Sequence, residues 1–411
     1  MSDALAPDST IVVVGASLAG LRAAEEVRHE GHVGPVIIIG EERHAPYDRP
    51  PLSKQLLAGT WDVARVHHHA PDALDTLGLE FRLGHRATSL DLESRVVVTD
   101  DGGGVHFDGL IVATGTVARP LPGTEGLPTV HTLRTLDDCL AIRSALTSAG
   151  ERARVVVIGA GFIGSEVAAT CHGLGAEVTV VEALPTPLSR VLGDEMGAAC
   201  AGLHRAEGVT LRTGVGVDRV TTPPRGDPPV VVHLVDGTDL EADLVVVGIG
   251  VVPAVGWLEG SGLRLDDGVV CRETLFAGDR VVAAGDVARW THTGLGEQLR
   301  VEHWTNAAEG GAAAARSLLA GPAAAQPYDP VPFFWSDQYS TKIQVVGLPG
   351  PEDEVVVVEG SVEEGKLVAL YRRGDRLRAA LAFSRPRHLM AYRPLLAAGA
   401  SFDEALAVSR S

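Results

Sequence analysis

The sequence predicts an α/β fold with two Rossmann-like dinucleotide-binding domains, one inserted in the other, and a small α+β C-terminal domain. Three observations carry this prediction: two glycine-rich turns that each leave a hydrophobic strand, an acidic residue after the next strand in each case, and a closing segment of alternating strands. One such turn binds one dinucleotide. Two in one chain therefore predict two dinucleotides, usually FAD and a nicotinamide that exchange electrons.

The first glycine turn follows the strand predicted over residues 11–14. Gly15 allows a tight turn, and Gly20 lets the next helix pack closely on the sheet. Ser17 stands where the second glycine of the pattern is usual. The helix N-terminus then presents free N–H groups and partial positive charge to the phosphates. Glu41 lies 26 residues after Gly15, where a ribose-binding acid is expected after about 20.

The second turn follows the strand predicted over residues 155–158 and keeps all three glycines, Gly159, Gly161 and Gly164. Gly161 lets the backbone approach a pyrophosphate closely. Glu182 follows Gly159 by 23 residues and is the matching acid. A single glycine pattern is weak evidence, because strand–glycine–helix turns also serve packing alone. Two copies, each with its acid, favour nucleotide binding.

Composition narrows the class of protein. The chain has 411 residues, 45% of them hydrophobic and 21% charged, and this fits a globular protein of two or three domains. Its net charge of −18 argues against nucleic acid and anionic membrane as partners. The longest apolar stretch, residues 244–258, is too short to cross a bilayer, and no apolar signal precedes the first strand. We therefore expect a cytoplasmic protein.

The cysteines predict neither a redox disulfide nor a metal site. None of them forms a CxxC or CxxxxC pair, and isolated cysteines of a cytosolic protein are usually small buried hydrophobes. They are Cys139, Cys171, Cys200 and Cys271. A flavin enzyme without a redox disulfide must pass its electrons to another acceptor.

The order of the segments predicts an insertion. Residues 1–118 and 250–325 are expected to form the FAD-binding domain, residues 119–249 the NADH-binding domain, and residues 326–411 the C-terminal domain. The stretch 119–126, rich in proline and glycine, is the predicted crossing linker.

Five further motifs strengthen the assignment. They are Tyr47-Asp48-Arg49-Pro50-Pro51-Leu52-Ser53-Lys54, Ala113-Thr114-Gly115, Ala284-Gly285-Asp286, Val301-Glu302-His303-Trp304-Thr305-Asn306 and Phe333-Phe334-Trp335-Ser336-Asp337-Gln338. With them, almost the whole chain resembles the FAD- and NADH-dependent ferredoxin reductases of oxygenase systems, the putidaredoxin reductase and biphenyl dioxygenase reductase type within the glutathione-reductase-like superfamily. Disulfide reductases of that superfamily carry a cysteine near the first of these motifs. Its absence here favours the branch that passes single electrons.

The resemblance implies an enzyme, an FAD-dependent NADH:ferredoxin oxidoreductase, and a monomer. Hydride would pass from NADH to FAD, and single electrons from there to a small iron–sulfur ferredoxin that feeds a cytochrome P-450-type monooxygenase or a Rieske dioxygenase. Such ferredoxins are commonly acidic, so this acidic chain would need a local basic dock. The candidates for that dock are Arg300, Arg378, Arg385 and Arg387.

The resemblance also assigns residues around FAD. Glu41 would bind the adenosine ribose, Asp286 the ribityl chain, and Trp304 would lie along the flavin ring. The other residues implied for FAD binding are Gly15, Ser17, Ala19, Gly20, Arg49, Lys54, Ala87, Ala113, Thr114, Gly115, Glu302 and Trp335.

Three residues are expected to be catalytic: Lys54, Glu166 and Phe162. Lys54 is one of only three lysines in an arginine-rich chain, so a point charge is favoured there over a bidentate fork. The resemblance implies that Glu166 pairs with Lys54 and orients it near the flavin. Phe162 either covers the flavin until the nicotinamide binds or serves only packing, and both interpretations stay open.

Glu182 predicts NADH over NADPH. A 2′-phosphate would meet like charge, and two unit charges 4 Å apart repel by about 1 kcal/mol in water and about 4 at an intermediate dielectric. The first arginine after Glu182 is Arg190. The other residues expected at the NADH site are Gly159, Gly161, Phe162, Ile163, Gly164 and Gly250.

Two other classes stay open. An NADH oxidase, or another NADH:acceptor flavoprotein that works without a disulfide, would use the same turns; a disulfide reductase is disfavoured by the cysteine pattern. A non-catalytic nicotinamide sensor, like the apoptosis-inducing flavoproteins, would also share them. Slow reoxidation with every acceptor would favour the sensor.

Overall fold

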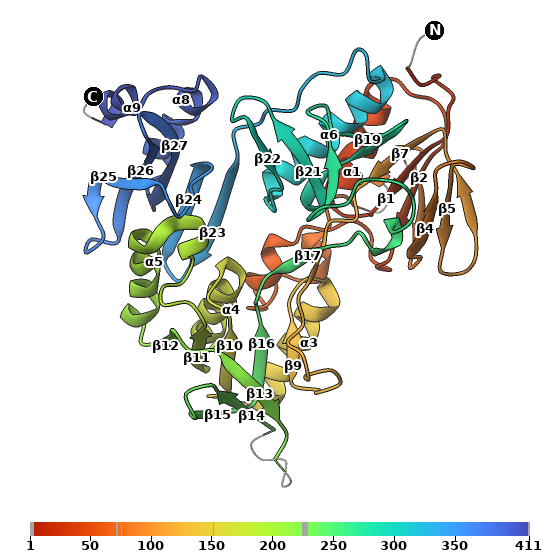
Figure 1. Ribbon diagram of the computed structural model, residues 1–411. Helices are drawn as coiled ribbons and strands as arrows, with labels where there is room; N and C mark the ends of the chain where they lie inside the picture. The colour runs from red at the N-terminus through yellow and green to blue at the C-terminus, as the bar shows by residue number, and fades with distance from the viewer. Residues whose placement is uncertain (1–3, 71–72, 75, 151, 224–228, 410–411) are drawn as a thin grey trace. The chain divides into compact units, whose positions relative to one another are not determined.

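The computed structural model describes residues 4–70, 73–74, 76–150, 152–223 and 229–409, which form two compact units (Figure 1). The first unit comprises Met1–Asp48, His67–Val117 and Val252–Pro332. The second comprises Arg49–Val66, Ala118–Val251 and Phe333–Ser411. Two short strands, β8 (Thr116–Ala118) and β17 (Val251–Pro253), lie where the chain passes from one unit to the other.

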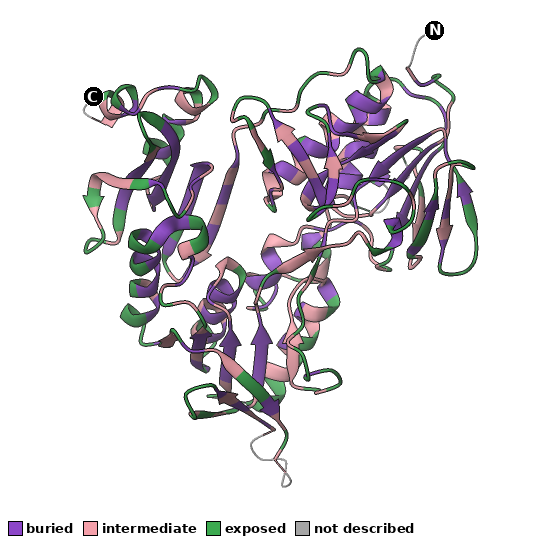
Figure 2. Cartoon of the chain, in the orientation of Figure 1, coloured by how far each residue is buried: buried purple, intermediate pink, exposed green. Residues whose placement is uncertain are grey.

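A six-stranded sheet forms the centre of the first unit. Its order is β19 (Phe276–Gly278), β20 (Val281–Ala283), β7 (Gly109–Val112), β1 (Ile11–Val14), β2 (Val36–Gly40) and β3 (Glu80–Leu83). All neighbours pair in parallel except β19 and β20. The four residues of β1 are buried (Figure 2), as the run Ile-Val-Val-Val of a sheet covered on both faces predicts. The strand order reverses at β1, and ligands of such sheets bind beyond the carboxyl ends at this point.

Helices α1 (Leu18–His29) and α6 (Trp304–Ala320) pack on each other in the first unit. A Cβ atom at Gly311 of α6 would lie 2.3 Å from the carbonyl oxygen of Ala19, so the close approach needs a glycine. Two small sheets complete the unit. They consist of β4 (Ala87–Asp91), β5 (Val96–Thr99) and β6 (Gly104–His106), and of β18 (Val269–Cys271), β21 (Ala288–His292) and β22 (Glu297–Leu299).

The second unit repeats the plan with a parallel five-stranded sheet. Its order is β12 (Thr210–Thr213), β11 (Glu177–Glu182), β10 (Arg154–Ile158), β16 (Leu244–Val247) and β9 (Val130–Thr132). Strand β10, which precedes the glycine turn, lies inside the sheet between β11 and β16, as β1 lies between β2 and β7 in the first unit. The remaining elements of this part are α3 (Leu136–Ala149), α4 (Phe162–Gly173), α5 (Ser189–Ala206) and a small sheet of β13 (Val217–Thr221), β14 (Val230–Leu234) and β15 (Asp239–Ala242).

An antiparallel sheet in the same unit holds the C-terminal segment. Its order is β23 (Phe333–Gln338), β24 (Thr341–Gly347), β27 (Arg376–Phe383), β26 (Lys366–Arg373) and β25 (Glu354–Ser361), followed along the chain by α7 (Pro386–Met390), α8 (Arg393–Ala397) and α9 (Phe402–Ser409). Buried residues of this sheet, among them Tyr371 and Phe383, form one hydrophobic cluster with Leu192 and Met196 of α5. The hydroxyl of Tyr371 donates to the carbonyl of Leu192 at 3.0 Å. That carbonyl precedes Gly193, whose φ of 73° and ψ of 173° break the helix.

The predicted fold class is confirmed, because both glycine turns leave parallel α/β sheets and an α+β segment follows them. The three predicted domain boundaries stay a prediction. No helix in the described ranges is both long and apolar enough to cross a membrane.

Candidate functional site

The two glycine turns share one backbone geometry. Gly15 has a φ of 119° and Gly159 a φ of 99°, values that favour glycine. A Cβ atom at Gly15 would lie 2.1 Å from the carbonyl oxygen of Ala113, and one at Gly159 would lie 2.3 Å from that of Gly248. Each turn therefore presses against the end of the neighbouring strand and has no room for a side chain.

The last glycine of each turn serves helix packing. A Cβ atom at Gly20 would lie 1.9 Å from the carbonyl oxygen of Gly15, and one at Gly164 would lie 2.0 Å from that of Gly159. A side chain at either position would come closer than 3 Å to backbone atoms, and the helix would then have to move away from the strand. The predicted roles of these glycines in packing therefore have a direct steric cause.

The middle position of the turn is different. Ser17 (φ −98°, ψ −165°) and Gly161 (φ −71°, ψ 179°) have similar extended conformations, so neither position requires glycine for its backbone. A Cβ atom at Gly161 would meet no atom within 4 Å. Gly161 therefore leaves open space beside the turn, and Ser17 follows the same backbone path with an added side chain.

Both helix N-termini suit a phosphate. In the described residues, neither α1 nor α4 has a side-chain cap hydrogen bond or an acidic residue in its first turn. The first amide groups of a helix need acceptors, and anions are stabilised there. The residues present therefore fit the pyrophosphate of FAD at the first turn and that of NADH at the second.

The acid of the second turn is held in place by backbone amides. Glu182 ends β11, and its carboxylate accepts hydrogen bonds from the amide of Ala160 at 2.8 Å and from that of Leu184 at 2.8 Å. A carboxylate offers about four lone-pair sites, so acceptor capacity remains for ribose hydroxyls. Glu41 follows β2 in the first unit and is exposed.

We expect Glu182→Ala to lower kcat/KM for NADH by about tenfold, because charge-assisted hydrogen bonds to the ribose are lost. The same change should reduce the ratio of kcat/KM for NADH to kcat/KM for NADPH, since it removes the negative charge that would face a 2′-phosphate. Steady-state kinetics with both nucleotides measure this change. A kcat/KM of the unsubstituted protein with NADPH that equals the value with NADH would contradict the assignment.

The first unit gathers several predicted FAD residues at the carboxyl ends of β1, β7 and β20. Ala113, Thr114 and Gly115 follow β7, and the hydroxyl of Thr114 donates to the carbonyl of Ala254 at 2.9 Å. A Cβ atom at Gly285, after β20, would lie 2.9 Å from the Cβ of Ala19. Thus the turn after β1, the segment after β7 and the segment after β20 meet. Ala87, by contrast, begins the separate sheet of β4 and is buried there.

Three predicted FAD residues of this unit have side-chain hydrogen bonds to their neighbours. Asp286 accepts a hydrogen bond from the hydroxyl of Thr116 at 3.2 Å. The indole N–H of Trp304 donates to Asp48 at 2.6 Å. Sequence reasoning did not single out Asp48, although it lies within the quoted motif around Arg49. Glu302 accepts from Arg300 at 2.6 Å.

The second unit contains a buried ion pair between Lys54 and Glu166. The ammonium of Lys54 donates to Glu166 at 2.6 Å, and the two side chains are 12% and 3% exposed. Lys54 follows a 3₁₀ helix over Pro50–Ser53, and Glu166 lies in α4 just after the glycine turn. The structure thus brings together the two residues predicted to pair.

Three further groups donate to the same carboxylate. They are the hydroxyl of Ser53 at 2.5 Å, the hydroxyl of Ser336 at 2.8 Å and the amide of Asp337 at 3.2 Å. With Lys54, they supply four donors to about four lone-pair sites. Glu166 therefore joins the segment after Arg49, the helix α4 and the strand β23. Ser53, Ser336 and Asp337 lie in motifs that were singled out in the sequence, but these three residues were not themselves predicted as site residues.

The other predicted residues of this unit have separate environments. The ring of Phe162 packs edge-on against Phe334, with centroids 5.0 Å apart, which accounts for its packing role; a role in covering the flavin stays a prediction. Arg49 donates to the carbonyl of Arg134. Trp335 lies on β23 with its ring 6.1 Å from that of Phe333.

Three residues predicted at the NADH site are exposed. Ile163 is 49% exposed at the start of α4. Arg190 is exposed in the first turn of α5. Gly250 follows β16 with a φ of 98° and is also exposed. All three remain accessible to a ligand within this unit.

The buried His204 and the half-buried His303 are expected to make stability depend on pH. Burial lowers the pKa of His204 to about 4 and that of His303 to about 4. Since the unfolded chain takes up these protons first, we expect the unfolding free energy to fall between pH 6.5 and pH 4, by about 1.4 kcal/mol per pH unit and histidine. Urea unfolding across this range measures the slope, and His204→Gln should make it shallower. An equal slope for the variant would contradict the expectation for His204.

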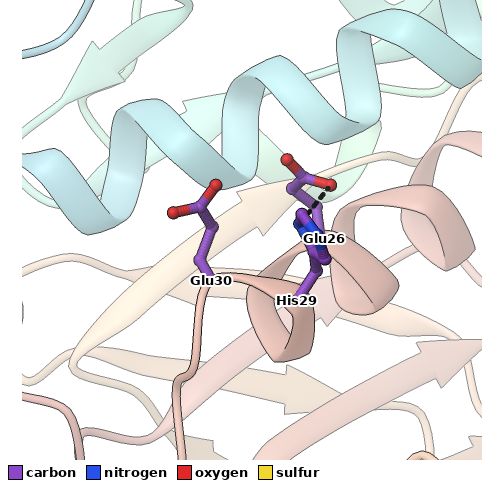
Figure 3. A group of neighbouring side chains, drawn as sticks. All are labelled: Glu26, His29 and Glu30. Carbon is purple, nitrogen blue, oxygen red and sulfur yellow. Dashed lines mark ion pairs between the residues drawn. The ribbon is translucent and has the colours of Figure 1, made fainter.

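A cluster of two glutamates and a histidine at the end of α1 carries no assigned function. Glu26, His29 and Glu30 come close enough to hold an ion (Figure 3). However, Glu26 pairs with His29 at 3.7 Å and with Arg316. Exposed acidic groups of this kind are common without a metal, and we assign no site here.

The structure argues against a docking role for three of the four arginines proposed as a basic dock. Arg300 pairs with Asp267 at 3.1 Å and with Glu302. Arg385 pairs with Glu359 at 2.6 Å. Arg378 is buried, with 9% of its surface exposed. Of the four, Arg387 in α7 is exposed. Nearby acids therefore neutralise much of the charge that the sequence offered.

Known proteins resemble the chain along its length. Residues 9–311 match the model of the pyridine nucleotide-disulphide oxidoreductase family, and residues 333–411 match a reductase C-terminal domain. Rhodocoxin reductase of Rhodococcus erythropolis is 34% identical over 98% of this chain and 95% of that protein. The ferredoxin–NAD(+) reductase component of the anthranilate 1,2-dioxygenase system of Burkholderia cepacia is 36% identical over 95% of each.

A solved structure agrees with these relatives. The covalent putidaredoxin reductase–putidaredoxin complex superposes with a TM-score of 0.89 at 33% identity, covering 95% of this chain and 93% of that one. The resemblance to oxygenase-system ferredoxin reductases is thereby confirmed. The paired glycine turns with their acids agree with these matches, which show that the chain belongs to the pyridine nucleotide-disulphide oxidoreductase family.

Proposed function

We propose that this protein oxidises NADH and reduces a small iron–sulfur ferredoxin, with FAD and NADH as its cofactors. The relatives are named for ferredoxin–NAD(+) reduction in dioxygenase systems and for the reduction of rhodocoxin and putidaredoxin. When bound, FAD supplies an acceptor for the hydride of NADH and a donor of single electrons. The reduced ferredoxin then serves a cytochrome P-450-type monooxygenase or a Rieske dioxygenase.

The chain contributes binding and orientation to this reaction. The turn at Gly15 and the N-terminus of α1 would hold the pyrophosphate of FAD, and the turn at Gly159 that of NADH. Glu182 would hold the ribose of NADH. Glu166 keeps the ammonium of Lys54 in one place, because three other donors hold the same carboxylate. Hydride transfer needs no protein base, so orientation and electrostatics are what these residues supply.

The observation that carries the choice of acceptor is the state of the cysteines. All four are buried and free. Burial raises the pKa of Cys139 to about 11 and those of Cys171, Cys200 and Cys271 to about 12. The thiolate is the reactive form, so no cysteine is available for disulfide chemistry. An acceptor outside the chain must take the electrons.

We therefore expect thiol alkylation to leave turnover intact. Treatment of the folded holoenzyme with N-ethylmaleimide should change ferredoxin reduction by less than about twofold, because buried thiols with raised pKa values react slowly. Mass spectrometry would count the alkylated cysteines. Loss of activity in step with modification of one cysteine would support a thiol-dependent reductase instead.

The reaction itself is tested by NADH oxidation in air with and without a [2Fe–2S] ferredoxin. We expect a slow basal rate that rises many-fold with the ferredoxin. A fast rate with oxygen alone, indifferent to ferredoxin, would make the protein an NADH oxidase. We also propose a cytoplasmic location and a monomer, which cell fractionation and light scattering would test.

A further inference from the structure

We propose that Tyr339 and His204 are positioning residues that fix the β23–β24 hairpin on α4 and thereby hold Glu166 beside Lys54. The inference rests on the proposed function for the role of the ion pair. Its structural part concerns the hairpin alone and can be tested separately.

Tyr339 has an unfavourable backbone conformation. The register pairs Gln338 with Thr341, so Tyr339 and Ser340 form a two-residue hairpin loop. Tyr339 has a φ of 54°. Glycine is the usual residue at the first position of such a loop when φ is positive, because a side chain makes this conformation unfavourable. A bulky aromatic at this position needs a compensating interaction elsewhere.

The compensating contacts come from helices α5 and α4 of the second unit. The hydroxyl of Tyr339 is hydrogen-bonded to Nδ1 of His204 at 2.7 Å, and the rings meet edge-on with centroids 5.5 Å apart. The ring of His172 contacts Tyr339 from α4, with centroids 6.1 Å apart. His204 is 1% exposed, and its Nε2 is hydrogen-bonded to the hydroxyl of Ser165 at 3.2 Å.

The hairpin therefore has two anchors on neighbouring residues of α4. Through His204, its tip reaches Ser165. Through Ser336 and the amide of Asp337, its strand reaches Glu166. Since Ser165 and Glu166 are adjacent, movement of the tip acts directly on the donors of the carboxylate. The same strand also carries Trp335, a residue predicted to lie at the flavin.

The amide of Asp337 reports this contact. Strand β23 is at the edge of its sheet, and this amide donates to Glu166 at 3.2 Å. If the Tyr339 anchor is lost, the hairpin opens more often and the amide exchanges faster with solvent. If Tyr339 serves only the packing of its own ring, removal of its hydroxyl leaves this amide unchanged.

The test uses Tyr339→Phe in the FAD-loaded protein. Residue-resolved hydrogen exchange should show the Asp337 amide exchanging about fivefold faster, the effect of one lost hydrogen bond. Tyr371→Phe is the matched control, since it removes another buried hydroxyl bond between the same sheet and α5. It should not change the Asp337 amide. Unchanged exchange at Asp337 in Tyr339→Phe, or an equal rise in both variants, would overturn the proposal.

A double-mutant cycle tests the functional part. In single-turnover experiments, Tyr339→Phe should slow NADH-dependent reduction of the holoenzyme by about fivefold alone and have no further effect in a Glu166→Gln background. Full additivity would show that Tyr339 acts elsewhere and would overturn the proposal. Failure of the parent protein to reduce ferredoxin would instead remove the proposed function, and the exchange result would still decide the structural part.

Discussion

Gly164→Ala is expected to destabilise the second unit strongly. The new Cβ would lie 2.0 Å from the carbonyl oxygen of Gly159, which is backbone and cannot rotate away. Helix α4 would have to leave the sheet, and with it the buried Glu166. We expect a loss of about 3 kcal/mol or more in unfolding free energy, measured by urea unfolding with circular dichroism.

Gly161→Ala is the matched control three residues earlier in the chain. Its φ is −71° and its Cβ would meet no atom within 4 Å, so stability should change by less than about 1 kcal/mol. NADH affinity should still fall, because the open space beside the turn is filled. Equal stability losses in the two variants would contradict the steric account of the turn. Unchanged NADH affinity in Gly161→Ala would contradict the placement of the nucleotide.

Glu166→Ala is expected to lower both the stability of the second unit and the rate of reduction by NADH. It leaves Lys54 charged in a buried place and removes the acceptor of Ser53, Ser336 and Asp337. Breaking a buried ion pair from one side costs about 3–5 kcal/mol. Calorimetry or urea unfolding measures the stability, and single-turnover reduction by NADH measures the functional loss.

Addition of Lys54→Met separates the two consequences. The double variant no longer holds an uncompensated charge, so it should regain part of the lost stability. Reduction by NADH should stay slow, because the point charge expected near the flavin is gone. Recovery of the reduction rate together with stability would show that the ion pair has only a structural role.

The glycine turns could be predicted from sequence because their causes are local. Gly15 and Gly20, like Gly159 and Gly164, meet backbone atoms at the ends of the strands that they leave or neighbour. The pairing of Lys54 with Glu166 came from the family resemblance, since 112 residues separate them. No spacing rule reaches that distance.

The groups that orient the site were beyond sequence reasoning. Asp48 and Trp304 are 256 residues apart, and Glu166 and Ser336 are 170 apart. Such pairs follow from how the sheets pack, and periodicity does not encode them. The case for the basic dock is weakened for a related reason, because one of the two acids that pair with Arg300 lies 33 residues earlier. The positive φ at Tyr339 likewise cannot be read from the residue type; it is seen only in the backbone of the two-residue hairpin loop.

The proposed transfer of electrons from NADH to ferredoxin is best tested by the electron balance without oxygen. NADH would be added in known amounts to the holoenzyme with excess oxidised [2Fe–2S] ferredoxin, and both absorbances followed. Since a hydride carries two electrons and the ferredoxin accepts one, we expect two ferredoxins to be reduced for each NADH consumed. Consumption of NADH without reduction of ferredoxin, or activity that appears only when oxygen is admitted, would contradict it.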